Sequence, residues 1–173
     1  PVISTNIYAG EVYDANKEIK NWSEATTHPA DWKNAVIATG NNIPKELRPQ
    51  LMPPIRMKEV IEAVDMWQDN EGNWIFDFGV NIAGIPVITI QQPKGTHLKM
   101  RMGEILNNDK SINYATTGVF ATNVIQTDEY ICSGEGVETW SPRFTYHGYR
   151  YLELSGSSGK PELSWIKTAL VYN

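Results

Sequence analysis

The sequence predicts an all-β fold, an antiparallel β-sandwich, from the spacing of its turn residues and the alternation of side chains between them. Clusters of Asp, Asn, Gly, Pro and Ser favour turns, because these residues accept positive φ angles or hydrogen-bond to nearby backbone. Such clusters divide the chain from about residue 56 onward into segments of strand length. They lie at residues 69–73, 93–95, 107–110, 133–136 and 156–159.

The segments between these turns repeat every two residues, as half-buried strands do. Residues 74–78 place three aromatic rings on one face, and residues 98–102 alternate apolar side chains with Lys and Arg. Residues 85–90 are apolar throughout, which predicts a buried strand with Pro86 at an edge or near its start. Residues 57–66 fit one or two helical turns and a strand equally well.

Residues 1–55 differ in texture from the rest, because they mix Trp, Asn and Pro with little periodicity. We therefore predict a short irregular N-terminal extension over residues 1–55, packed on a sandwich domain of residues 56–173. The chain starts at Pro1 without a leader segment and stops in an apolar stretch. We expect it to be a piece of a longer protein.

Composition narrows the classes of partner. The net charge of -5 and the pI near 5.2 argue against nucleic acid and against an anionic membrane surface. No apolar run approaches the roughly 20 residues that a bilayer span requires. The single cysteine, Cys132, excludes an internal disulfide and a cysteine-rich metal site. We expect neither a nucleic-acid nor a membrane partner.

No catalytic constellation stands out in the sequence. Glycoside hydrolysis needs two carboxylates about 5 to 10 Å apart across a sugar site. Asp128 and Glu129 are adjacent, so on a strand they face opposite ways and make a poor pair. Nucleophile and phosphate-loop motifs are absent, and Cys132 has no histidine near it in sequence. We therefore assign no catalytic residue.

Metal binding is equally weakly indicated. His28, His97 and His147 lack the spacing of a metal site. Calcium would find oxygen ligands in residues 107–109 or in residues 69–71, but hairpin turns require the same residue types. The turn interpretation is the simpler one, so we expect no cofactor and keep calcium as the alternative.

Aromatic residues offer another kind of site, because sugars stack on aromatic rings. The six Trp residues are spread along the chain, and most are expected in the core or in contacts with another part of a longer protein. Trp22 and Trp32, in the irregular extension, are the candidates for an exposed ring that stacks against a sugar.

Several stretches, in chain order, resemble motifs of one enzyme family. Asn6 to Ala15 is similar to I-Y-x-G-E-x-Y-D-A-R, and Phe76 to Gly84 is similar to F-D-F-G-Q-N-x-x-G. The most specific stretch, Trp140 to Tyr151, follows W-x-P-x-F-x-Y-H-G-F-R-Y. The others are Asn21-Trp22-Ser23 with Asp31-Trp32, Pro53-Pro54-Ile55-Arg56, Arg101 to Leu106 and Thr127 to Tyr130. On these motifs the chain resembles the bacterial α-L-rhamnosidases.

The resemblance implies a non-catalytic part of such an enzyme. In this family the catalytic acids, which hydrolyse terminal α-L-rhamnose, lie on an (α/α)₆ barrel that follows a concanavalin-like β-sandwich. This chain resembles that sandwich, with residues 1–55 as the tail of a preceding jelly-roll domain plus linker. The barrel of the same parent chain is then the expected partner, carbohydrate is a second, and an exported parent, periplasmic or on the cell surface, is expected. Asn16, Val80 and Gly103 depart from the motifs, which puts polar contacts in doubt but not the fold.

The motif residues also suggest a polar cluster, because buried charges must be paired. We predict a network near one end of the sandwich that maintains the fold and docks the barrel or contacts sugar. Its members are Asp77, Asn81, Glu104, His147 and Arg150. Three functions are therefore compared: a structural accessory domain, a carbohydrate-binding module for rhamnosyl glycans, and an independent hydrolase, which lacks a catalytic pair.

Overall fold

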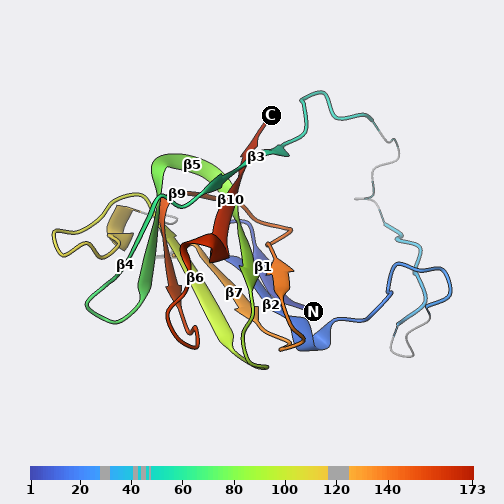
Figure 1. Ribbon diagram of the computed structural model, residues 1–173. Coiled ribbons are helices and arrows are strands. Elements are labelled where there is room, and N and C mark those ends of the chain that lie inside the picture. Colours follow the sequence, from blue (N-terminus) through green and yellow to red (C-terminus); the bar gives the residue numbers. More distant parts are fainter. Residues whose placement is uncertain (28–31, 41–42, 44–45, 47, 117–124) are drawn as a thin grey trace.

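The computed structural model describes residues 1–173 except 28–31, 41–42, 44–45, 47 and 117–124 (Figure 1). Strands dominate the described chain, and the helices are single 3₁₀ turns. The strands are β1 (Val2–Asn6), β2 (Gly10–Asp14), β3 (Arg56–Glu62), β4 (Asp65–Gln68), β5 (Trp74–Ile90), β6 (His97–Gly103), β7 (Thr127–Ile131), β8 (Glu138–Trp140), β9 (His147–Ser155) and β10 (Ile166–Tyr172). The 3₁₀ turns are η1 (Ala15–Lys17), η2 (Tyr114–Thr116) and η3 (Leu163–Trp165). No helix among these residues is long and apolar enough to cross a membrane.

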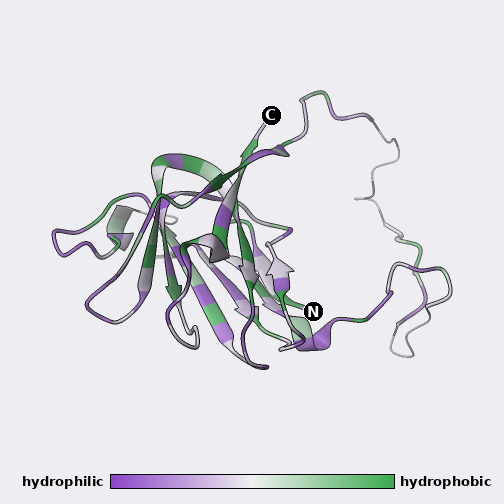
Figure 2. Ribbon diagram, viewed as in Figure 1, coloured by the Kyte–Doolittle hydropathy of each residue, from purple (hydrophilic) through white to green (hydrophobic). Residues whose placement is uncertain are grey.

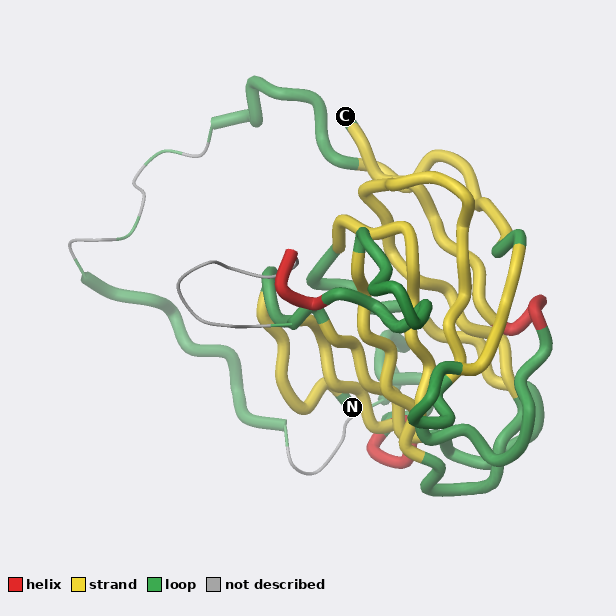
Figure 3. The backbone as a smooth tube through the Cα atoms, turned by 90° about the vertical axis from the view of Figure 1, so that its left-hand side faces the viewer, coloured by secondary structure: helices red, strands yellow, loops and turns green. Residues whose placement is uncertain are grey.

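The strands form one curled mixed sheet in the order β1-β2-β7-β6-β9-β5-β10-β3, with β4 and β8 also paired to β5. Neighbouring strands are antiparallel except β2 and β7, which run parallel. The quarter-turned view in Figure 3 shows the strands wrapping around a common interior. The all-β sandwich expected from the sequence is confirmed, with one parallel pair that alternation alone does not reveal.

Strand β5 organises the sheet because it is 17 residues long and pairs with four others. On one side of β5, the pairing with β9 ends at Gly84 and the pairing with β8 begins at Ile88. Pro86 falls in this interval, while β10 pairs with β5 on the other side. The proline therefore lies at a local edge inside a long strand, where one side of the ladder is interrupted.

The main core lies inside the curl and follows the predicted alternation. Phe76 and Phe78 from β5 meet the apolar face of β6 and Leu152 and Leu154 from β9. Figure 2 shows apolar and polar residues alternating along β6. A smaller cluster on the other face joins Ile75 to Tyr151 and Ile112. Burial of apolar surface stabilises a fold by about 25 cal/mol per Å². Because both faces of this sheet bury apolar side chains, their burial is the main contribution to the stability of the domain.

The first 14 residues are more regular than the sequence indicates. Strands β1 and β2 form a hairpin, and β2 adds to the sheet beside β7. Strand β1 is exposed at every position, so no buried face imposes an alternation on it. Figures 1 and 3 show the described parts of residues 18–55 running outside the sheet before β3 joins it at the opposite edge. The segment that fitted helix or strand equally well forms β3 and β4.

Candidate functional site

A wide bulge in β5 creates the first cluster of polar motif residues. Asp77 faces Tyr151 and Ile82 faces Tyr149, so residues 78–81 stand opposite the single residue Arg150. Gly79 has a φ of +76°, which favours glycine, and its N–H donates to Asp77 Oδ1 at 2.6 Å. Bulges of this kind redirect side chains and are common beside functional sites.

Asp77 and Arg150 form a two-pronged ion pair across the bulge. Arg150 Nε and Nη2 donate to the two carboxylate oxygens at 2.8 and 2.9 Å. The Arg150 hydrogen bonds hold the pKa of Asp77 below its usual value, with help from the Gly79 N–H and against the effect of burial. Arg150 also lies over the Tyr151 ring at 5.0 Å. The pair fixes the bulge to β9.

Asn81 and Glu104 form a second, exposed contact close by, in which Asn81 Nδ2 donates to Glu104 Oε1 at 3.1 Å. Gln126 braces β9 at Gly148: it accepts from the Gly148 N–H and donates to the Gly148 carbonyl. Four of the five network candidates therefore lie around the bulge, in two separate pairs. The sequence did not single out Gln126.

His147 belongs to a different, fully buried cluster. Its Nε2 lies 3.0 Å from Asp128 Oδ2, and Asp128 Oδ1 accepts from the Glu11 N–H at 2.9 Å. The Glu11 carboxylate accepts from the N–H groups of Arg143 and Phe144 at 3.3 Å each. Burial raises the pKa of Glu11, and these backbone donors oppose the shift. This buried-charge cluster, defined as Glu11, Asp128 and His147, joins β2, β7 and β9.

Sequence reasoning missed Glu11 and assigned Asp128 no role. A usable signal precedes Glu11: Gly10 has a φ of +118°, and a Cβ there would overlap the Thr127 carbonyl. The Gly10-Glu11 pair is therefore the feature of the sequence that could have pointed to this close approach of two backbones. The carboxylate that follows is then buried beside the partner strand.

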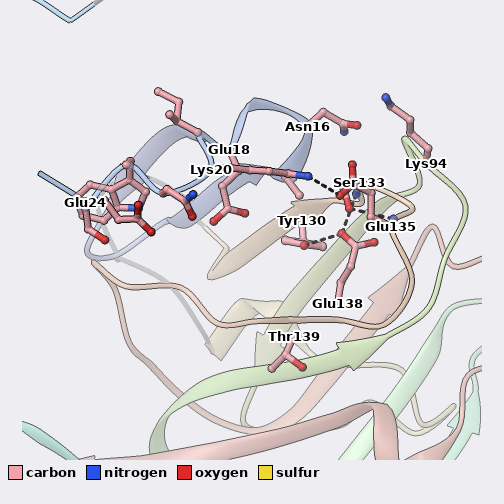
Figure 4. Close-up of a pocket in the computed structure, with 15 residues that line it drawn as sticks. Asn16, Glu18, Lys20, Glu24, Lys94, Tyr130, Ser133, Glu135, Glu138 and Thr139 are labelled. Atoms are coloured by element: carbon pink, nitrogen blue, oxygen red, sulfur yellow. Dashed lines mark hydrogen bonds and ion pairs between the residues drawn. The ribbon is translucent and has the colours of Figure 1, made fainter. Parts of the chain in front are cut away.

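A cavity of about 750 Å³ opens beside η1 (Figure 4). Its floor includes Glu138, which accepts from Tyr130 Oη at 2.9 Å and from the backbone of Ser133 and Gly134. Lys20 and Glu135 form an exposed ion pair at its rim. The lining also includes Trp22, which is half exposed, whereas Trp32 is similarly exposed and does not line the cavity.

The two calcium candidates lie around a second cavity of about 350 Å³. Asp69 Oδ1 accepts from the backbone of Glu71 and Asn73, and Asp109 Oδ1 accepts from Ser111. These oxygens are thus engaged in turns. Across the described residues no group of three His, Cys, Asp or Glu is placed to hold a metal ion, and His28 lies outside those residues.

The thiol of Cys132 offers no activated nucleophile. Cys132 is fully buried, and burial raises its pKa to about 12, with the charge of Glu138 acting in the same direction. A thiol with this pKa stays protonated near neutral pH.

Models of two known protein domains match this chain. The bacterial alpha-L-rhamnosidase concanavalin-like domain matches residues 68–172, and the alpha-L-rhamnosidase N-terminal domain matches residues 1–59. The chain belongs to the bacterial α-L-rhamnosidase family. The bulge, the buried-charge cluster and the end of β6 lie in stretches that carried the resemblance. The first match covers the sandwich from β5 to β10.

Individual relatives are much longer than this chain. It is 35% identical to an alpha-L-rhamnosidase of Formosa agariphila over 99% of its own length but 18% of the relative. It is similar in structure to the alpha-L-rhamnosidase from Dictyoglumus thermophilum, with a TM-score of 0.85, 35% identity and coverage of 96% of this chain and 18% of that one. For the Streptomyces avermitilis alpha-L-rhamnosidase complexed with L-rhamnose, the TM-score is 0.90 at 31% identity, with 99% and 16% covered. The chain thus corresponds to about a sixth of these rhamnosidases.

The ion pair at the bulge makes a pH-dependent contribution to stability. Because the pKa of Asp77 is lowered in the folded state, this contribution is complete above the unfolded value of about 3.9 and is lost as pH falls through the folded pKa. We predict that Asp77→Asn lowers the free energy of unfolding near neutral pH by about 1 kcal/mol, since Arg150 is partly exposed. Urea unfolding across the acid range would show the difference shrinking below about pH 4.

The matched control is Glu71→Gln, which removes an exposed loop carboxylate and should leave the pH profile close to that of the unmodified chain. A difference between the unmodified chain and Asp77→Asn that stayed constant from neutral pH to strong acid would contradict the assignment.

Proposed function

We propose that this chain is the accessory β-sandwich of a longer α-L-rhamnosidase, which supports the catalytic domain of the same chain and supplies no catalytic group. The observation that carries the proposal is the match itself. Nearly the whole chain aligns with about a sixth of each relative. The two structural comparisons give TM-scores of 0.85 and 0.90. The expected partner is the (α/α)₆ barrel that the resemblance implies.

The environment of the buried acids supports a structural role. A glycosidase pair must reach a sugar from two sides. Glu11 and Asp128 are close together but completely buried: one Glu11 oxygen and one Asp128 oxygen accept from backbone N–H groups, and the other Asp128 oxygen contacts His147. Glu138 is bound by a tyrosine and two backbone N–H groups. All three acids fix segments of the sheet, and the burial of Glu11 and Asp128 leaves a substrate no access to them.

We predict that the purified 173-residue chain releases no p-nitrophenol from p-nitrophenyl α-L-rhamnoside above the rate of buffer, whereas the complete protein does. The reason is that the catalytic pair would lie outside this segment. The assay is absorbance of the released phenol across acid to neutral pH, with the Glu11→Gln variant as a control for contaminating activity. Turnover by the chain that disappears in Glu11→Gln would overturn the proposal.

The cavity beside η1 favours a second candidate function, sugar binding. Its lining combines the half-exposed Trp22 ring with polar groups from Asn16, Glu18 and Thr139, which is the composition that a pyranose site needs. The cavity volume of about 750 Å³ is in the range of small-ligand sites. This candidate differs from the first because it requires a free ligand rather than a second domain.

Calorimetric titration with L-rhamnose, with and without calcium, separates the two candidates. If the cavity binds sugar, the chain gives saturable heat that Trp22→Ala removes and Trp32→Ala retains, because only Trp22 lines the cavity. Absence of heat at millimolar rhamnose in both calcium conditions would count against sugar binding. Equal loss in both variants would place the ligand elsewhere.

A further inference from the structure

Two neighbouring turns expose a cluster of large apolar side chains at one corner of the sandwich. The corner surface, defined as Ile7, Tyr8, Phe144 and Tyr146, has exposed fractions of 50%, 63%, 61% and 41%. The first pair lies in the hairpin turn between β1 and β2, and the second pair lies just before β9. Single exposed apolar residues are ordinary, but grouped aromatic rings mark interaction sites.

The two turns are locked to each other. Thr145 Oγ1 donates to the Ile7 carbonyl at 3.1 Å, and the Phe144 N–H donates to Glu11 at 3.3 Å. In the hairpin turn, Asn6 Oδ1 accepts from the backbone N–H groups of Tyr8 and Ala9. The exposed rings are therefore carried on a braced backbone, which reduces the conformational entropy that binding would cost.

The bracing uses groups that are expensive to bury. Glu11, Asp128 and His147 are at most 1% exposed, and within the described chain Glu11 Oε1 and His147 Nδ1 have no hydrogen-bond partner. Burying a polar or ionisable group away from water is costly unless the group is hydrogen-bonded. These buried groups fix two turns whose own large side chains are exposed and add little to the core. Such a frame is what an interface requires.

We propose that the corner surface packs against an apolar patch on the catalytic domain of the longer rhamnosidase chain. The inference rests on the proposed function and names the surface through which the sandwich supports the catalytic domain. More than four fifths of each relative lies outside the part that matches this chain. A catalytic domain in the same longer polypeptide is therefore present at one copy per sandwich. A covalently attached domain also binds at high effective concentration.

The size of the surface favours an attached partner over a second copy of the chain. At 150–250 Å² for an aromatic side chain, the exposed fractions give roughly 400 Å². A stable complex between separate proteins buries about 800 Å² on each partner. The corner surface falls short of this requirement, whereas a domain held by the peptide chain does not need it.

Hydroxyl-radical footprinting of the complete protein tests the proposal, with the 173-residue chain as reference and rates normalised to a radical dosimeter. Tyr8, Phe144 and Tyr146 should be modified severalfold more slowly in the complete protein, because the catalytic domain covers them. In the complete protein, the double substitution Tyr8→Ser with Phe144→Ser should restore fast modification of Tyr146. Val137→Ser, at another exposed apolar position, should not.

The outcomes separate this inference from the proposed function. Fast modification of all three rings in the complete protein, with protection at Met57 or Tyr172 instead, would overturn the corner surface and leave an accessory domain docked elsewhere. If no residue of this segment were protected, both would fail. Protection that already occurs in the 173-residue chain and rises with its concentration would identify a second copy as the occupant and overturn the inference.

Discussion

The parallel pairing of β2 with β7 is the constraint on which the arrangement of this domain depends. Three residue pairs, from Val12↔Glu129 to Asp14↔Ile131, attach the N-terminal hairpin to the sandwich. The attachment is possible because Gly10 lets the two backbones meet, and Asp128 then binds the next N–H. Both candidate surfaces follow from this junction. The corner surface lies at the start of β2, and the cavity beside η1 lies at its end.

Charge in this domain is used to join segments that packing alone would leave free. The Asp77–Arg150 pair ties a four-residue bulge to β9, and the buried-charge cluster ties a hairpin and a loop to β7. Buried polar pairs are weak sources of net stability, but removing one partner of such a pair is strongly destabilising, so each pair holds its two segments together. This use of polar pairs agrees with the proposed accessory role, in which the sandwich presents a fixed surface to another domain.

Sequence patterns predicted the strands that bury a face and failed where no face is buried. The aromatic alternation of residues 74–78 predicted the start of β5, because those side chains enter the core. The hairpin of β1 and β2 carries no such signal, since β1 is exposed throughout. Motif acids pointed to the cluster around Asp77, but a partner such as Asp128 can be found only once strand register is known. The parallel pair likewise depends on tertiary contacts.

The central claim is that the buried charges fasten the hairpin to the sandwich. Native-state hydrogen exchange of the chain and its Asp128→Ala variant tests it most directly. We predict that amides of residues 10–14 lose most of their protection in the variant, because the Glu11 N–H and His147 lose their shared acceptor, while β6 amides stay protected. Breaking a buried pair costs about 3–5 kcal/mol, so the effect should be large. Unchanged protection of residues 10–14 would contradict the account.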